Sequence, residues 1–157
     1  MPTTHARFGT DLRLLHDLER VKSNRDPGND LSTIKRSETG QIDLDVLTGT
    51  DNLVQALLLR FLIPMGELTI LGHPNYGSRL AELIGELNNE TNRNRAKLYV
   101  LQALADEPRV KQVLSVKVTQ NQRERARMDI DINLLAVDSN TPLNLVFPFF
   151  LEGGIST

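Results

Sequence analysis

The spacing of apolar residues predicts helices through the first two thirds of the chain. Residues 11–22 carry an apolar residue at every third position, which is typical of a short amphipathic helix. Residues 50–63 are apolar at most positions, so we expect a helix that is buried on most sides and ends at Pro64. Residues 78–87 and 91–105 have the spacing of one helical face. The positions expected to face inward in these two helices are Leu80, Leu83, Ile84 and Leu87, followed by Ala96, Leu98, Leu101, Leu104 and Ala105.

The last third of the chain alternates apolar and polar residues, which predicts three β-strands. The alternating apolar positions are Leu114, Val116 and Val118 in the first strand, Met128, Ile130, Ile132 and Leu134 in the second, and Leu143, Leu145, Phe147, Phe149 and Leu151 in the third. Short polar segments join them, so consecutive strands are expected to pair antiparallel. Pro142 and Pro148 cannot donate to a ladder, which favours an edge position for the last strand. The predicted class is α+β, with N-terminal helices packed on a small C-terminal antiparallel three-stranded sheet.

Residues 23–49 interrupt this regular pattern. They are rich in Ser, Asn, Asp, Gly and Pro, with a brief alternation of Ile42, Leu44 and Val46 near the end. An extended arm that orders on a partner and an ordinary surface loop both fit such a segment. We therefore divide the chain into an N-terminal helix and extended arm, residues 1–49, and a compact domain, residues 50–157.

Composition and charge exclude several classes of protein. The chain has no cysteine, so it contains no disulfide, thiolate metal site or cysteine nucleophile. Its formal net charge of -2 provides no global attraction to nucleic acid or to an anionic membrane. The three histidines are too scattered for a metal-binding motif, and no glycine-rich phosphate loop is present. We expect no metal site and no cofactor.

The apolar segments do not predict membrane insertion. The most apolar run, residues 53–63, is about half as long as a membrane-spanning helix, and Gln55 and Arg60 interrupt it. The N-terminal residues lack the charged start and apolar core of a secretory signal. We therefore expect the mature chain to be the whole chain.

Candidate catalytic and nucleic-acid-binding groups are present but weakly specified. A glycosidase requires two carboxylates across a cleft, and Glu67 with Glu82 or Glu86 is a candidate pair. Sequence spacing does not establish the distance between these carboxylates. Arg123, Arg125 and Arg127 alternate, so one strand face could present them together to phosphates or to an acidic protein partner. Solvation of these charges is the simpler explanation for both groups.

Glu107, Pro108 and Arg109 form the most suggestive tripeptide, because a helix end, a rigid proline and the start of a strand meet there. One interpretation is an exposed recognition corner. The other is an internal pair of Glu107 with an arginine that fastens the helix to the sheet. The residue pattern favours neither.

The order of these motifs resembles a known family. An apolar helix is followed by PMGELTILGHPNYGSRL, a helical pair, ALADEPRV, and alternating strands that end in NLVFPFFL. Over about residues 50–151 this order is similar to the baseplate wedge, sheath-initiator family of contractile phage tails, type VI secretion systems and phage-tail-like injection particles. Members of this family are sometimes labelled lysozyme-like.

The resemblance implies a non-enzymatic part that assembles in the cytoplasm and becomes part of the particle's baseplate. Its partners would be wedge proteins, whose helical core bundle it sits on, and sheath subunits, whose extended arms join its sheet by strand addition. The resemblance places Glu107, Pro108 and Arg109 at the contact with wedge partners. The residues expected at the remaining partner contacts are Asn144, Leu145, Val146 and Phe147 of the last strand, with Arg123 and Arg125 of the charged hairpin.

Three points stay open. A tube or spike protein is a candidate partner for residues 1–49, which lie outside the matched part. The main alternative function is a lysozyme-like peptidoglycan hydrolase that uses residues such as Glu67 and Glu82. Nucleic-acid binding through the hairpin from Arg123 to Arg127 is a third hypothesis, although we expect no nucleic-acid partner.

Overall fold

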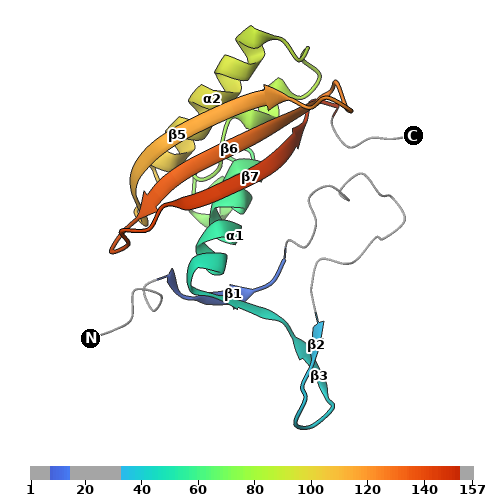
Figure 1. Ribbon diagram of the computed structural model, residues 1–157, viewed down its shortest axis with the longest axis vertical. Coiled ribbons are helices and arrows are strands. Elements are labelled where there is room, and N and C mark those ends of the chain that lie inside the picture. The colour runs from blue at the N-terminus through green and yellow to red at the C-terminus, as the bar shows by residue number, and fades with distance from the viewer. Residues whose placement is uncertain (1–7, 15–32, 153–157) are drawn as a thin grey trace. The chain divides into compact units, whose positions relative to one another are not determined.

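The computed structural model describes residues 8–14 and 33–152 (Figure 1). These residues form two compact units: residues 8–14 with 33–55, and residues 56–152. Helix α1, Gly49–Leu62, contributes its first turns to the first unit and the remainder to the second. The division of the chain into domains at residues 49 and 50 remains a prediction.

The first unit is built from short antiparallel strands. Strand β1, Thr10–Leu12, pairs with β4, Val46–Thr48, and strand β2, Thr33–Lys35, pairs with β3, Ile42–Leu44. The helix predicted for residues 11–22 is therefore wrong at its start, because residues 10–12 are extended, and residues 15–22 lie outside the described part.

The predicted arm also contains regular structure. We expected residues 23–49 to lack structure of their own, but β2, β3 and β4 all fall within this segment, while residues 23–32 lie outside the described part. The alternation of Ile42, Leu44 and Val46 was the visible signal. Ile42 and Leu44 belong to β3, which pairs locally with β2, whereas Val46 belongs to β4, whose partner β1 is far away in the sequence and could not be inferred from this segment.

The two longer helices confirm their predictions, but the buried face of the second one differs. Helix α1 ends just before Pro64, and α2, Glu90–Ala105, begins after Asn89, whose side chain accepts a hydrogen bond from the N–H of Asn92 at 2.8 Å. Leu98 was expected to face inward but is 51% exposed. The buried residues of α2 are Asn92, Ala96, Tyr99, Val100, Ala103 and Leu104. Asn92 and Tyr99 are buried because hydrogen bonds satisfy their polar atoms, which an apolar count misses.

The helix predicted for residues 78–87 does not form. Only a 3₁₀ turn, η4, Leu80–Leu83, is present, and Ile84 is already extended. Gly85 follows in the left-handed conformation, with φ of 90°, and its N–H bonds to the carbonyl of Leu151. Ile84 and Leu87, which we expected to be buried, are 47% and 76% exposed. The 3₁₀ turn thus ends before the apolar pattern does, and the chain continues in non-helical geometry through Gly85.

The second unit contains the predicted three-stranded antiparallel sheet. Strands β5, Val110–Gln120, β6, Arg127–Ala136, and β7, Leu143–Phe150, pair in consecutive order, and β7 is an edge strand as predicted. In β6, buried residues alternate with partly exposed ones along the whole strand, and Met128, Ile130, Ile132 and Leu134 are fully buried. In β5, however, the register shifts between Val113 and Ser115, so Leu114 is an extra residue and is 47% exposed.

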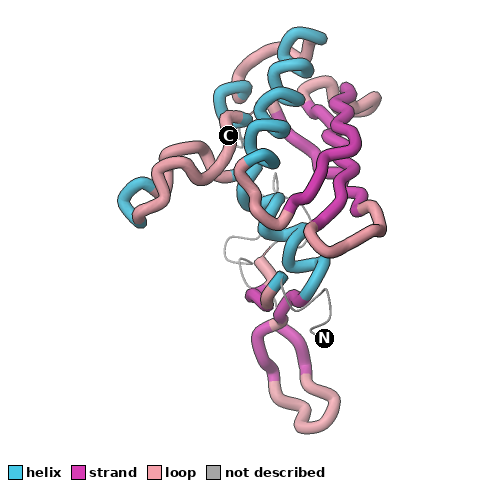
Figure 2. Tube along the Cα trace, turned by 90° about the vertical axis from the view of Figure 1, so that its left-hand side faces the viewer, coloured by secondary structure: helices cyan, strands magenta, loops and turns pink. Residues whose placement is uncertain are grey.

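The helices of the second unit cover one face of this sheet (Figure 2). Phe61 of α1 stacks on Phe147 of β7, with ring centroids 5.2 Å apart, and α2 packs on β5. The remaining sheet face carries mostly polar side chains, including Lys117 and Asp131, which lie opposite each other. The predicted α+β class is confirmed.

Candidate functional site

The corner between α2 and β5 is fixed by local backbone chemistry. After α2 ends, the N–H of Glu107 bonds to the carbonyl of Leu104 at 3.2 Å, and the N–H of Val110 bonds to the carbonyl of Glu107 at 3.2 Å. Pro108 has no N–H and disfavours helical geometry in the residue before it, so the helix cannot continue. The chain therefore turns at Glu107 and enters β5 at Val110.

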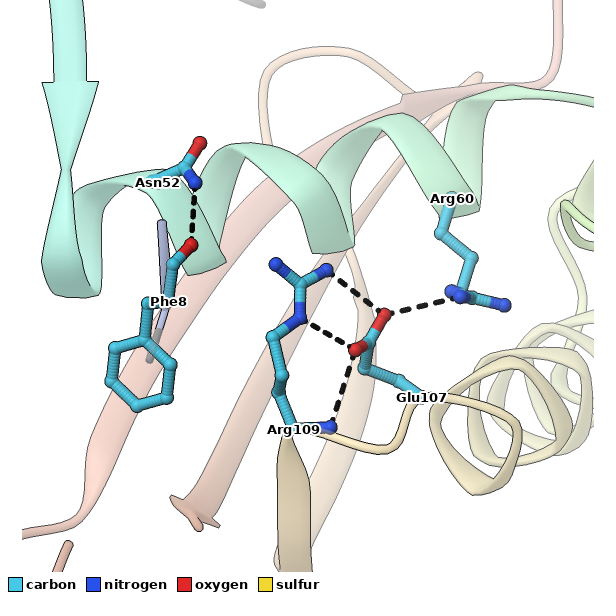
Figure 3. Close-up of polar contacts among 5 residues, drawn as sticks. All are labelled: Phe8, Asn52, Arg60, Glu107 and Arg109. Atoms are coloured by element: carbon cyan, nitrogen blue, oxygen red, sulfur yellow. Dashed lines mark hydrogen bonds and ion pairs between the residues drawn. The ribbon is translucent and has the colours of Figure 1, made fainter. Parts of the chain in front are cut away.

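The side chain of Glu107 is enclosed by two arginines (Figure 3). Its Oε2 atom accepts a hydrogen bond from Nη2 of Arg60 at 3.1 Å and one from Nη2 of Arg109 at 3.2 Å. Its Oε1 atom accepts from Nε of Arg109 at 2.7 Å and from the N–H of Arg109 at 3.2 Å. The exposed fraction is 2% for the side chain of Glu107, 10% for Arg60 and 32% for Arg109.

These contacts keep Glu107 ionised. Burial by itself raises the pKa of this carboxyl, but hydrogen bonds from the side chain and N–H of Arg109, together with the charges of Arg109 and Arg60, outweigh burial and lower the pKa below its ordinary value. The hydrogen bond to Glu107 raises the pKa of Arg109 in turn. At neutral pH, Glu107 and Arg109 therefore form an ion pair, and Arg60 is a second arginine bound to the same carboxylate.

Arg60 completes the group from α1. Its guanidinium lies over the ring of Tyr76, 4.5 Å from the centroid, and its Nε atom is buried with no hydrogen-bond partner in the part of the chain that the structure describes. We call Arg60, Tyr76, Glu107 and Arg109 the corner cluster. Two arginines face one carboxylate, so the corner cluster carries a net charge of about +1 at neutral pH.

The geometry corresponds to the internal pair that the sequence left open as one interpretation. Glu107 is buried and fastens α1 to the start of β5, while Pro108 is exposed and Arg109 reaches the surface in part. Contact of these three residues with a partner remains a prediction. The sequence reasoning did not assign Arg60 or Tyr76 to the site; the available signal was that Arg60 is the only polar residue among residues 56–62 of α1.

The last strand presents a second candidate surface. Leu145 and Phe147 are buried in the core, whereas Val146 is 57% exposed. Asn144 is exposed and donates from Nδ2 to Asp131 at 2.8 Å and to Asn133 at 3.0 Å. The four residues named from the sequence thus divide between the core and the outer face of the sheet.

The main-chain groups of β7 also divide between its two sides. Just beyond β7, the N–H of Leu151 bonds to the carbonyl of Ala126, at 2.8 Å, on the side of β6. Hydrogen bonding alternates along antiparallel strands, so Asn144 and Val146 direct their N–H and C=O groups away from β6. Pro148 lies two residues after Val146, so its main chain also faces away from β6, and its missing N–H removes no hydrogen bond to β6. Among the described strands, β7 pairs with β6 alone.

The arginines of the charged hairpin do not share one strand face, which corrects the expectation. Arg123 and Arg125 lie in the exposed turn between β5 and β6. Arg127 is the first residue of β6, where its Nε bonds to Asp129 at 2.7 Å. The alternation does not place the three arginines on one face, because residues 121–126 form the turn between the strands and belong to neither strand.

The candidate catalytic carboxylates occupy different settings. Glu67 is exposed in the loop after α1, and Glu82 pairs with Arg79, with Nε to Oε1 at 2.9 Å. The hydrogen bond from Arg79 lowers the pKa of Glu82, which is opposite to the shift that a general acid needs. Among the described residues, no group of three or more His, Cys, Asp or Glu side chains could hold a metal ion.

A groove at one end of the sheet was not foreseen from the sequence. It has a volume of about 650 Å³, and its lining includes the apolar Ile84, Leu87 and Leu151. Glu86 and Glu152 also line it. The groove therefore brings together two carboxylates, although neither Glu67 nor Glu82 is one of them. None of the described helices is long and apolar enough to cross a membrane.

Comparisons with known proteins connect this fold to a tail protein. No family model and no curated protein matches the chain. A crystal structure from Geobacter sulfurreducens, described as a "putative tail lysozyme", is similar with a TM-score of 0.57 and 26% sequence identity. The similarity covers 65% of this chain and 90% of that chain. It extends over nearly all of that protein, so the two share an architecture rather than a local motif.

Proposed function

We propose that this chain is a structural, non-catalytic component of a contractile injection apparatus. In this proposal it docks on the wedge core bundle of the baseplate and provides the first template for sheath subunits. The motif order and the similarity to a protein named for a tail both support this assignment. The observation that carries it is the outer side of β7, where main-chain groups face away from β6.

Strand addition explains how such an edge would recruit a sheath subunit. An extended arm laid along β7 would bond to the N–H and C=O groups of Asn144 and Val146. Val146 is exposed beside this edge and offers an apolar contact, while Pro148 limits how far the added ladder extends. The buried alternate residues Leu145 and Phe147 hold the template strand rigidly on the core.

The corner cluster is the proposed contact with the wedge. Its surplus positive charge and the partly exposed Arg109 suit an acidic group on the partner, since a guanidinium binds a carboxylate through paired hydrogen bonds. Glu107 would act from inside by fixing the direction of Arg109. This division of roles makes Arg109 the contact residue and Glu107 a positioning residue.

Electron microscopy of particles from cells that lack this chain tests the proposal. We expect sheathless tubes or separate baseplate pieces, and normal particles when the full chain is restored. Intact contractile particles without the chain would refute the initiator function. Two variants of the restored chain test the proposed wedge contact. Arg109→Ala removes the contact residue, and the control Arg93→Ala removes an arginine on α2 that lies outside the corner cluster.

Peptidoglycan hydrolysis is the second candidate, because the groove collects Glu86 and Glu152 beside apolar and amide side chains. The name of the similar protein from Geobacter sulfurreducens agrees with this candidate. Purified chain would then release soluble fragments from peptidoglycan, and Glu86→Gln and Glu152→Gln variants would each abolish the release. No release by the unaltered chain would eliminate the candidate.

A further inference from the structure

The loop that follows α1 carries two large aliphatic side chains into solvent. Residues 65–77, here called the projecting loop, stand away from the rest of the second unit (Figure 2). At its tip, in the 3₁₀ turn η3, Thr69–Leu71, Ile70 is 96% exposed and Leu71 is 71% exposed. Single exposed apolar residues are common on protein surfaces, but adjacent ones at the tip of a projection indicate a contact site.

The projecting loop is held in one shape by its own hydrogen bonds. The N–H of Thr69 and the hydroxyl of Thr69 both bond to the carbonyl of Gly66, at 3.2 and 2.6 Å, and the N–H of Gly72 bonds to the carbonyl of Thr69 at 3.0 Å. Gly72 ends the turn in the left-handed conformation, with φ of 86°. A partner would meet a prearranged surface and lose little entropy in ordering it.

The base of the projecting loop is closed tightly. Two hydrogen bonds cross the base, each 2.9 Å long. The N–H of Met65 donates to the carbonyl of Ser78, and the N–H of Ser78 donates to the carbonyl of Ile63. Gly77 permits this approach, because a Cβ atom there would lie 2.4 Å from the carbonyl oxygen of Ile63. The tip is therefore positioned by the same closed base that follows the end of α1.

We propose that Ile70 and Leu71 form an anchor that inserts into an apolar pocket on a neighbouring protein of the assembly, with a lysine or arginine at the rim of that pocket. This inference rests on the proposed function and extends its wedge contact. Tyr76, near the C-terminal end of the loop, packs against Arg60, so this end of the loop lies beside the corner cluster. Buried aliphatic anchors commonly dominate the affinity of such interfaces.

Charge selects this occupant over two others. Residues 64–78 contain one acidic residue, the exposed Glu67, and no lysine or arginine. A loop that inserts into an anionic membrane needs the opposite charge. A second copy of this chain offers an apolar groove, but Glu86 and Glu152 line it with Arg125 as the single cation, so it would repel Glu67. A pocket with a cationic rim complements the loop.

Photo-crosslinking in the producing cells identifies what the tip touches. The full chain is made with Ile70→p-benzoylphenylalanine, and the matched control carries the same group at Leu98, which is 51% exposed on α2. We expect position 70 to crosslink to one peptide of another baseplate protein, beside an apolar pocket with a Lys or Arg at its rim. Crosslinks to a second copy, to lipid, or to no defined peptide would overturn the proposal.

Substitution measures how much the anchor contributes. The double variant Ile70→Ser, Leu71→Ser should leave the thermal unfolding temperature unchanged, since both side chains are exposed, yet reduce the amount of chain in purified particles at least about tenfold. The control pair Leu98→Ser, Leu114→Ser removes two other exposed leucines and should leave occupancy unchanged. Normal occupancy of the Ile70, Leu71 variant would refute the anchor. The initiator function would still stand if deletion of the whole chain abolishes the sheath.

Discussion

At the scale of single residues, the corner cluster predicts a pH-dependent stability. Glu107→Gln should lower the free energy of unfolding at pH 7 by about 2–4 kcal/mol, because the buried Arg60 loses its anionic partner. Folding lowers the pKa of Glu107. The contribution of this carboxylate to the free energy of unfolding is therefore complete above the pKa that Glu107 has in the unfolded chain, and it is lost as the pH falls through the pKa that Glu107 has in the folded chain. Urea unfolding at pH 7 and at successively lower pH should show that the difference in the free energy of unfolding between the unaltered chain and Glu107→Gln becomes smaller in acid.

The control for this prediction is Glu124→Gln, which removes an exposed carboxylate from the turn between β5 and β6. Its effect should stay within about 0.5 kcal/mol at either pH. If the loss caused by Glu107→Gln were as large at low pH as at pH 7, the charge of Glu107 would not be the stabilising feature.

Gly77 and Gly72 allow steric crowding to be separated from backbone strain. Both have positive φ, but a Cβ atom at Gly77 would meet the Ile63 carbonyl at 2.4 Å, while a Cβ atom at Gly72 would meet nothing within 4 Å. Gly77→Ala should therefore destabilise the chain by about 3 kcal/mol or more, and Gly72→Ala by about 1–2 kcal/mol, the cost of left-handed backbone alone. Chemical unfolding of both variants measures the difference. Equal losses would mean that the base of the projecting loop relaxes easily.

At the scale of elements, the edge of β7 makes the sharpest functional prediction. Val146→Pro removes an N–H that points away from β6, so the sheet should survive, as it does with Pro148 two positions later. A sheath arm added along this edge would lose a main-chain bond, and we expect most particles to be sheathless by electron microscopy. Val146→Thr keeps the N–H and should assemble normally. Folded Val146→Pro protein that still supports complete sheaths would place the arm elsewhere.

The sequence predicted those elements whose signal is local and regular. Strand β6 alternates fully buried and partly exposed residues along its length, so its position and inner face could be read directly. The bulge at Leu114 could not, because it arises from pairing with β6 and leaves no mark in the β5 sequence. The helix expected over residues 78–87 failed for a different reason: the apolar spacing was correct, but Gly85 and its bond to Leu151 outweighed it.

The candidate site was predicted in part. The corner at Glu107, Pro108 and Arg109 was visible because a helix end, a rigid proline and the start of a strand meet there. Its third charge, Arg60, comes from α1, 47 residues earlier in the chain, and only the tertiary fold brings the two together. The groove and the exposed tip of the projecting loop were hidden for the same reason. Exposure of Ile70 and Leu71 depends on what the fold leaves uncovered, and hydrophobic pattern alone reads such residues as core.

At the scale of the whole molecule, the two compact units predict that the second one folds without the strands of the first. Within the first unit, β1 and the residues beside it are fastened to the opening turns of α1: Nδ2 of Asn52 donates to the carbonyl of Phe8 at 2.6 Å, and Gln55 bonds to Leu12 and Leu14 at 2.7 and 2.8 Å. The core of the three-stranded sheet belongs to the second unit. Residues 49–157 should therefore retain it.

Amide hydrogen exchange compares the full chain with a fragment of residues 49–157. The amides of β6 should keep their protection within about tenfold in the fragment, because the bonds to β5 and β7 and the buried residues Ile130 and Ile132 are all retained. The control is the same fragment with Ile130→Asp, which places a charge in this core. Its amides should lose their protection from exchange throughout the sheet, so it gives the exchange rates of the unfolded fragment. If the unaltered fragment exchanged as fast as this variant, the two units would form one cooperative structure, and residues 1–48 would be needed to fold the three-stranded sheet.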